Sequence, residues 1–149
     1  MAAARRVFLL NGPNLNLLGT REPEIYGADT LADIEARCAA RAAALRLALD
    51  FRQTNSEGRL VDWIQEARGA AEAVILNAAA YTHSSIAVHD ALKAYGGYVV
   101  ELHLSNPHRR EPFRHVSHVA TAADGVIAGF GAFGYELALD AVAARLDAA

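Results

Sequence analysis

Short apolar runs alternate along this chain with longer segments whose apolar residues recur at near-helical spacing. The runs mostly lack polar alternation, which is typical of strands covered on both faces in a parallel sheet. Five strands that alternate with helices predict βαβ units and a doubly wound α/β sheet. We expect the flavodoxin-like strand order 2-1-3-4-5, with helices on both faces. The apolar runs occupy residues 7–10, 47–51, 73–76, 98–102 and 125–128.

Four helices are expected between and after these strands. Serine and threonine favour helix N-caps and glycine favours helix ends, so these residue types mark the bounds. No linker, charge run or repeat divides the sequence, and residues 1–149 are therefore expected to form one domain. The helices are expected to follow Thr30, to follow Ser56 and stop at Gly69, to run from Ser84 or Ser85 to Gly96, and to run from about Gly134 to Leu146.

The composition argues against several classes of protein. The net charge of −3 and the pI near 6.0 give no basic surface for general nucleic-acid binding. The lone cysteine, Cys38, cannot form an internal disulfide or a thiolate zinc site. No apolar run approaches the roughly 20 residues of a membrane span, and the run that follows residues 1–6 is too short for a signal-peptide core. We expect a soluble, cytoplasmic protein without nucleic-acid or membrane partners.

The connection after the first strand, residues 11–27, is much longer than the roughly 2–6 residues usual between a strand and a helix. Ligands of doubly wound sheets bind beyond the carboxyl ends of the strands, so a long loop there indicates a functional lid. The loop contains Asn14, Arg21 and Tyr26. A cation beside a tyrosine favours the phenolate. The alternative is that Tyr26 packs against the loop while Arg21 lies in solvent.

Polar residues also follow the third strand. Asn77 closes that strand, and residues 82–85 lie where the next helix begins, a position at which free amides favour an anion. Ordinary capping by Ser84 or Ser85 would explain part of this pattern. His83 is not needed for a cap, which favours a ligand-binding role for it.

The fourth strand ends with Glu101 and His103, which point to one face of the strand because they are two residues apart. A carboxylate beside an imidazole fixes its tautomer and raises its proton affinity, which suits a general acid. A buried pair with a purely structural purpose is the alternative. Residues 107–115 follow with three arginines, one of which could clamp a carboxylate in bidentate fashion.

Two other patterns are interpreted as structural. Residues 129–134 match G-x-G-x-x-G, but too little chain follows for a dinucleotide site, so we expect a tight turn that packs the last helix. The second pattern is a group of four histidines whose spacing fits no familiar zinc site, and no metal is expected there. These histidines are His103, His108, His115 and His118.

The residues after the strands closely resemble the motifs of type II 3-dehydroquinate dehydratase. The resemblance covers nearly the whole chain, in the order and at the length of that family. Several correctly spaced motifs together are far more specific than any one alone. The matching segments are residues 10–19, Arg21-Glu22-Pro23, Tyr26-Gly27, residues 55–58, Leu76-Asn77, residues 80–85, residues 101–106, residues 109–114 and residues 125–131.

The resemblance implies dehydration of 3-dehydroquinate to 3-dehydroshikimate, a step of the shikimate pathway. It implies trans elimination of water through an enolate, with no cofactor, Schiff base or metal. Tyr26 would be the general base, Arg21 would favour its phenolate, and Asn14 would hold a water that stabilises the enolate. His103 would be the general acid, oriented by Glu101. The substrate would be held by Asn77, His83, Arg114, the backbone of Leu104 and Ser105, and Asp90 from a neighbouring subunit of a dodecamer built from trimers.

The sequence departs from the family pattern at two places. Ala78-Ala79 follows Asn77 where the family usually has Pro-Gly, and a positive φ at Ala79 would carry strain. His89 precedes Asp90 where the family commonly has arginine. We expect these departures to change local loop geometry rather than function.

The competing functional class is a flavodoxin-like module that binds a nucleotide or flavin without catalysis. Residues 11–19 lack the glycines and the Lys-Ser/Thr ending of a phosphate loop, which argues against it. A member of the lineage that has lost activity is a third possibility, and intact Tyr26, Arg21 and His103 argue against that. Lys93 is the only lysine, so a Schiff-base dehydratase would have to use it.

Overall fold

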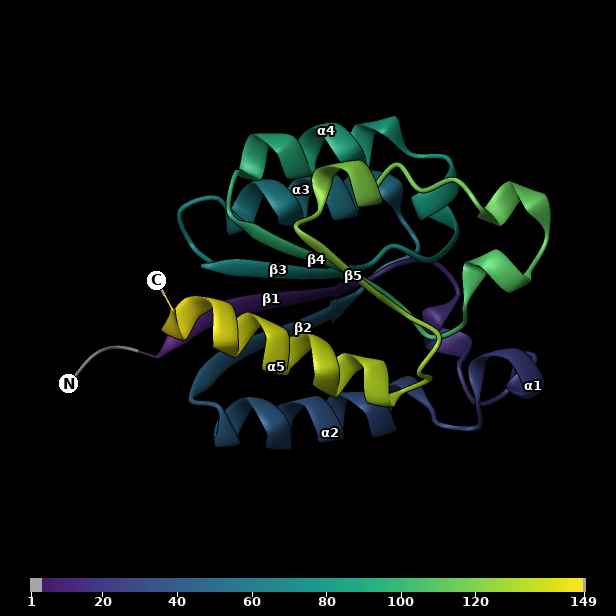
Figure 1. The fold of residues 1–149 in the computed structure, drawn as a ribbon, viewed down its shortest axis with the longest axis horizontal. Helices are drawn as coiled ribbons and strands as arrows, with labels where there is room; N and C mark the ends of the chain where they lie inside the picture. The colour runs from purple at the N-terminus through teal and green to yellow at the C-terminus, as the bar shows by residue number, and fades with distance from the viewer. Residues whose placement is uncertain (1–3, 149) are drawn as a thin grey trace.

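A computed structural model describes residues 4–148. Residues 1–3 and residue 149 lie outside the described part, and residues 1–3 begin the segment that was considered above as a signal peptide. Five parallel strands form one sheet in the order β2-β1-β3-β4-β5 (Figure 1), which confirms the expected fold class and strand order. The strands are β1 (Arg5–Asn11), β2 (Leu47–Gln53), β3 (Ala73–Asn77), β4 (Tyr98–His103) and β5 (Gly125–Ala128).

Helices cover both faces of the sheet, as expected (Figure 1). On β1, Val7 and Leu9 pack into the core on the side of α2 and α5, whereas Phe8 and Leu10 pack into the core on the side of α3 and α4. All four side chains are fully buried, so this part of the strand has no polar face, and this explains the continuous apolar run at residues 7–10. The helices are α2 (Leu31–Ala44), α3 (Glu57–Ala67), α4 (Ile86–Tyr95) and α5 (Phe133–Asp147).

The helix ends follow the capping residues of the sequence. Thr30 and Asp33 form a capping box at the start of α2, and the hydroxyl of Ser56 accepts the Arg59 amide at the start of α3. Of the two candidates before α4, Ser85 is the cap, since its hydroxyl accepts the Val88 amide. Gly96 ends α4 in the left-handed conformation. No helix within residues 4–148 is long and apolar enough to cross a membrane.

The two long connections at the carboxyl edge of the sheet are partly helical. The segment after β1, expected as a loop, contains a 3₁₀ turn (Leu15–Leu17) and the single-turn helix α1 (Pro23–Tyr26), which starts on a proline as helices often do. The connection between β4 and β5 contains no full helix, but three 3₁₀ turns. They span Pro107–Arg109, Pro112–Arg114 and Ala120–Ala122.

Tight turns bring these connections close to the strand ends. The φ angle of Ala79 is +52°, so the strain expected at this departure from the family pattern is present. Gly12 lies directly against the same turn, because a Cβ at Gly12 would clash with the carbonyl oxygen of Ala78. Gly129 and Gly131 have positive φ angles of 93° and 61°, and the G-x-G-x-x-G segment is the turn into α5 that we expected.

Candidate active site

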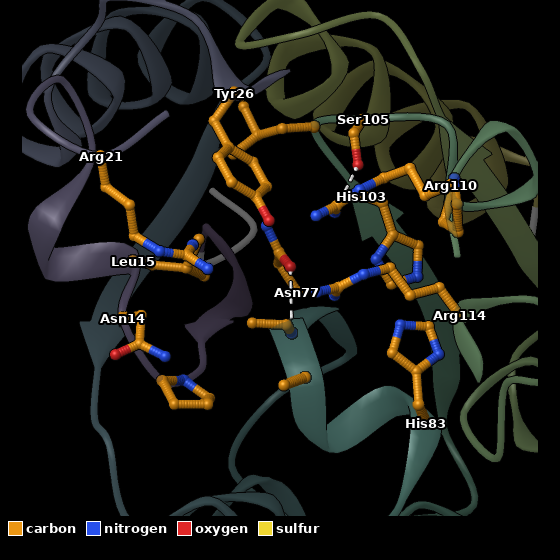
Figure 2. A pocket seen from close by; sticks show the side chains of 15 residues that line it. Asn14, Leu15, Arg21, Tyr26, Asn77, His83, His103, Ser105, Arg110 and Arg114 are labelled. Carbon is orange, nitrogen blue, oxygen red and sulfur yellow. Dashed lines mark hydrogen bonds between the residues drawn. The ribbon is translucent and has the colours of Figure 1, made fainter. Parts of the chain in front are cut away.

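A cavity of about 580 Å³, partly open to solvent, lies beyond the carboxyl ends of β1, β3 and β4. This is the edge of the sheet at which the sequence predicts convergence, and Figure 2 shows the side chains that line the cavity. The segment after β1 contributes Asn14, Arg21 and Tyr26; the end of β3 and the turn after it contribute Asn77 and His83; β4 and the segment after it contribute His103, Leu104, Ser105, Arg110 and Arg114.

Tyr26 lies between two guanidinium groups. The Cζ atoms of Arg21 and Arg110 are each 5.0 Å from the centroid of its ring, within the range of cation–π attraction. The packing alternative holds in part, because the half-buried Tyr26 ring also packs against the core and Arg21 pairs with Glu22 at 3.5 Å. Two cations nevertheless lie against the Tyr26 ring, as the residue types of this loop and of residues 107–115 allow.

Arg110 was missing from the predicted site. The signal available in the sequence was the group of three arginines at residues 109–114, from which the sequence gives no means of choosing. Arg110 is held in place by a hydrogen bond from Nη1 to the Ser105 hydroxyl at 3.3 Å (Figure 2). It therefore connects Tyr26 to the segment that follows β4.

Glu101 and His103 form a buried pair. Glu101 is 1% exposed and His103 is 8% exposed, and the imidazole Nε2 donates to the carboxylate Oε2. The same oxygen accepts a hydrogen bond from the hydroxyl of Ser117 at 2.8 Å. Because Nε2 is bonded to the carboxylate, Nδ1 is the nitrogen of His103 that remains for a ligand.

His83 lies beside this pair. Its ring is nearly parallel to that of His103, with an interplanar angle of 13° and 6.5 Å between centroids. His83 Nδ1 donates to the carbonyl oxygen of Val116 at 2.8 Å, which leaves Nε2 as the acceptor. Burial lowers the pKa of His83, and the nearby His103 and Arg114 act in the same direction. His83 is thus suited to bind a hydroxyl group as a neutral imidazole.

Asn77 is fixed by a chain of buried hydrogen bonds. Its Nδ2 donates to the hydroxyl of Tyr135 at 2.9 Å, and that hydroxyl donates to Asn11 Oδ1 at 2.7 Å. Its Oδ1 accepts the backbone amide of Ala79 at 3.2 Å (Figure 2). Burial raises the pKa of Tyr135, so this hydroxyl stays a neutral donor. The chain sets the orientation of the Asn77 amide from within the protein.

Three guanidinium groups give the cavity a positive lining. Arg114 is 17% exposed and its Nε bonds to Glu111 Oε2 at 3.1 Å, while Arg21 and Arg110 face Tyr26. Arginine is the usual partner for carboxylates in such positions, because its planar fork matches two oxygens. The cavity can therefore hold a small anionic ligand beside a tyrosine and a carboxylate-paired histidine.

A model of the family described as Dehydroquinase class II matches residues 5–143. The chain belongs to the class II dehydroquinase family. It is 64% identical to a 3-dehydroquinate dehydratase of Hyphomonas neptunium, over 93% of this chain and 92% of that one. It is 57% identical to a Pseudomonas aeruginosa protein named 3-dehydroquinate dehydratase 2, over 97% of this chain and 98% of that one. The resemblance to this family and the expectation of an enzyme are thereby confirmed.

Solved structures agree with the family assignment. The type II dehydroquinase of Propionibacterium acnes matches with a TM-score of 0.92 at 43% identity, covering 97% of this chain and 99% of that chain. Membership of the class II dehydroquinases decides against the alternative of a flavin- or nucleotide-binding module without catalysis.

Two residues named from the class II dehydroquinase pattern lie apart from the cavity. Asp90 is exposed on α4 and is not among the residues that line the cavity of this chain. His89, which replaces the usual arginine, bonds through Nδ1 to the carbonyl oxygen of His118 at 2.7 Å. It therefore ties α4 to the connection between β4 and β5. Within residues 4–148, no group of three or more His, Cys, Asp or Glu side chains is arranged to hold a metal.

Proposed function

We propose that this class II dehydroquinase converts 3-dehydroquinate to 3-dehydroshikimate by trans elimination of water through an enolate, without a Schiff base or a metal. The observation that carries the proposal is the placement of Tyr26 between two guanidinium groups in a cavity that is also lined by His103, the partner of the buried Glu101. Loss of a proton next to a ketone and loss of a hydroxyl group need a base and an acid, and these two groups supply them.

Tyr26 acts as the base in its phenolate form. It removes the proton from the carbon next to the ketone, and the electrons of that C–H bond form the enolate with its charge on the ketone oxygen. Arg21 and Arg110 favour the phenolate through their charge, since both guanidinium groups lie against its ring. The enolate oxygen is stabilised by a water held by Asn14, whose side chain is exposed at the cavity.

His103 acts as the acid in its imidazolium form. It donates its Nδ1 proton to the departing hydroxyl; the C–O bond breaks, the enolate electrons form the new C=C bond, and water leaves. Glu101 stabilises the imidazolium through Nε2 and holds the ring in position. After one turnover Tyr26 carries a proton and His103 has lost one, so transfer of one proton through solvent restores the starting state.

The substrate is bound by the remaining groups at the strand ends. Asn77, His83 and the backbone of Leu104 and Ser105 bind its hydroxyls and carboxylate, and Arg114 supplies the positive charge. Asp90 approaches from a neighbouring subunit of a dodecamer built from trimers, which is supported by its exposure on α4. Gel filtration with light scattering tests this assembly, and a monomer in solution would contradict it.

The position of the lone lysine supports the enolate route. Lys93 lies in the last turn of α4 and does not line the cavity, so within residues 4–148 no lysine is placed to form a Schiff base with the ketone. The direct test is to add 3-dehydroquinate to purified protein and follow the ultraviolet absorbance of the enone product. We expect turnover that persists in EDTA and after treatment with borohydride and substrate. Loss of activity in EDTA would contradict the metal-free route, and inactivation by borohydride would contradict the enolate route.

A further inference from the structure

Ser117 lies behind the Glu101–His103 pair, outside the set of residues already given a role. Its hydroxyl donates to Glu101 Oε2 at 2.8 Å, the same oxygen that accepts from His103 Nε2. The other oxygen of the carboxylate, Oε1, is buried without a protein partner among the described residues. Ser117 is therefore the second of two donors that hold this buried negative charge.

The direction of the Ser117 hydroxyl is fixed by its own surroundings. Its oxygen accepts the backbone amide of Ala120 at 3.0 Å, at the start of the 3₁₀ turn Ala120–Ala122. A hydroxyl has one proton to donate, and this contact leaves that proton for the carboxylate. The segment is anchored on both sides of Ser117. The carbonyl oxygen of Val116 accepts a hydrogen bond from His83, and the backbone amide of His118 donates to the carbonyl oxygen of Thr82.

We infer that Ser117 is a positioning residue that holds the Glu101 carboxylate and takes up part of its negative charge, so that His103 is a stronger proton donor than Glu101 alone would allow. A carboxylate paired with an imidazole raises the proton affinity of the imidazole. A second donor on the same oxygen weakens that effect, because it stabilises the carboxylate after the imidazole has lost its proton. This role rests on the proposed function of His103 as the acid.

Other charged or titratable groups face the pair as well, and the test has to separate their effects from that of Ser117. A second cavity lies behind the pair. It is lined by side chains from the turn after β3, from β4 and β5, and from the connection between these two strands. These groups are His83, His108, Arg114 and His115 on the side of Ser117, and Arg21, Tyr26 and Arg110 on the side of the substrate cavity.

The experiment compares Ser117→Ala with Ser117→Thr and Thr82→Val. In Ser117→Ala we expect about a tenfold loss of kcat and little change in KM. We also expect the basic limb of the kcat–pH profile, which reports the loss of the His103 proton, to move to a pH about one unit higher. Ser117→Thr keeps the hydroxyl and restores both properties. Thr82→Val is the matched control, because Thr82 Oγ1 is buried beside the same cavity and has no hydrogen-bond partner within residues 4–148. The kcat of this variant should stay within about twofold of wild type.

A purely structural role for Ser117 would lower thermal stability without moving the limb, and that result overturns the inference. An equal shift in Thr82→Val also overturns it, since the effect would then belong to the cavity and not to the contact with Glu101. The titration of the His103 ring, followed by NMR without substrate and assigned with His103→Gln, should move upward in Ser117→Ala. Such a shift in a protein that forms no enone would refute the proposed function while supporting the role of Ser117.

Discussion

Replacement of Ala79 by glycine is expected to stabilise this protein. The φ angle of Ala79 is +52°, and its amide is bonded to Asn77 Oδ1, so the turn is held in a conformation that its side chain disfavours. The left-handed region costs a residue with a Cβ about 1–2 kcal/mol, and glycine avoids that cost. Against this, glycine gives the unfolded chain extra freedom worth about 0.4–1 kcal/mol.

Ala80 provides a matched control in the same 3₁₀ turn, because its φ is not in the left-handed region. Ala80→Gly carries the same entropic cost without relief of strain, so we expect it to destabilise. The difference between the two variants cancels the entropy and leaves the strain. A fully buried methyl is worth about 0.8 kcal/mol, and the half-buried Ala79 loses roughly half of that, which leaves a difference of about 1 kcal/mol.

For a chain of this size the difference corresponds to a Tm about 2–4 °C higher in Ala79→Gly than in Ala80→Gly. The assay is thermal unfolding followed by circular dichroism, with all variants at one protein concentration because assembly makes Tm depend on concentration. A Tm of Ala79→Gly at or below that of Ala80→Gly would show that the positive φ carries no recoverable strain.

Three further results are expected. Tyr26→Phe should lower kcat by a factor of about 10² or more with Tm unchanged, because it removes the base and leaves the ring between its arginines; a rate near that of wild type would remove Tyr26 from this role. Tyr135→Phe should lower the free energy of unfolding, measured in urea, by about 1–3 kcal/mol, because it leaves two buried amides short of a partner, and an unchanged value would refute the hydrogen-bond chain. Burial raises the pKa of Cys38 to about 12 from 9.0, so the neutral thiol contributes stability below pH 9 that is lost as the pH rises toward 12. Between pH 8 and pH 10, wild type should therefore lose about 1.4 kcal/mol more stability than Cys38→Ala, and equal losses would contradict the shift.

The strands could be predicted from the sequence because burial on both faces leaves an apolar run, as at residues 7–10. Their order was predictable because five strands that alternate with helices favour the flavodoxin-like arrangement, which is the order observed. The helix starts were predictable where a hydroxyl caps them, as at Thr30 and Ser56. The helix Pro23–Tyr26 was missed because one turn is too short for a period to be recognised. The other features depend on contacts between residues that lie far apart in the sequence, and no sequence pattern marks such contacts.

The contacts around the site illustrate this limit. Glu101 and His103 are two residues apart, so their pairing follows from strand geometry alone. Ser117 lies 16 residues from Glu101, and Tyr135 lies 58 residues from Asn77, with irregular backbone or whole elements between them. The choice of Arg110 as the second cation on Tyr26 depends on the path of the 3₁₀ turns after β4, which propensity does not specify.

The stacking of Tyr26 between Arg21 and Arg110 has a consequence for protein engineering. Arg21 and Tyr26 belong to one connection, whereas Arg110 belongs to the other. A graft of residues 12–27 into another chain of this architecture would carry the tyrosine with one guanidinium and leave the second behind. The two connections therefore form a single exchangeable unit, and a working transplant has to move them together.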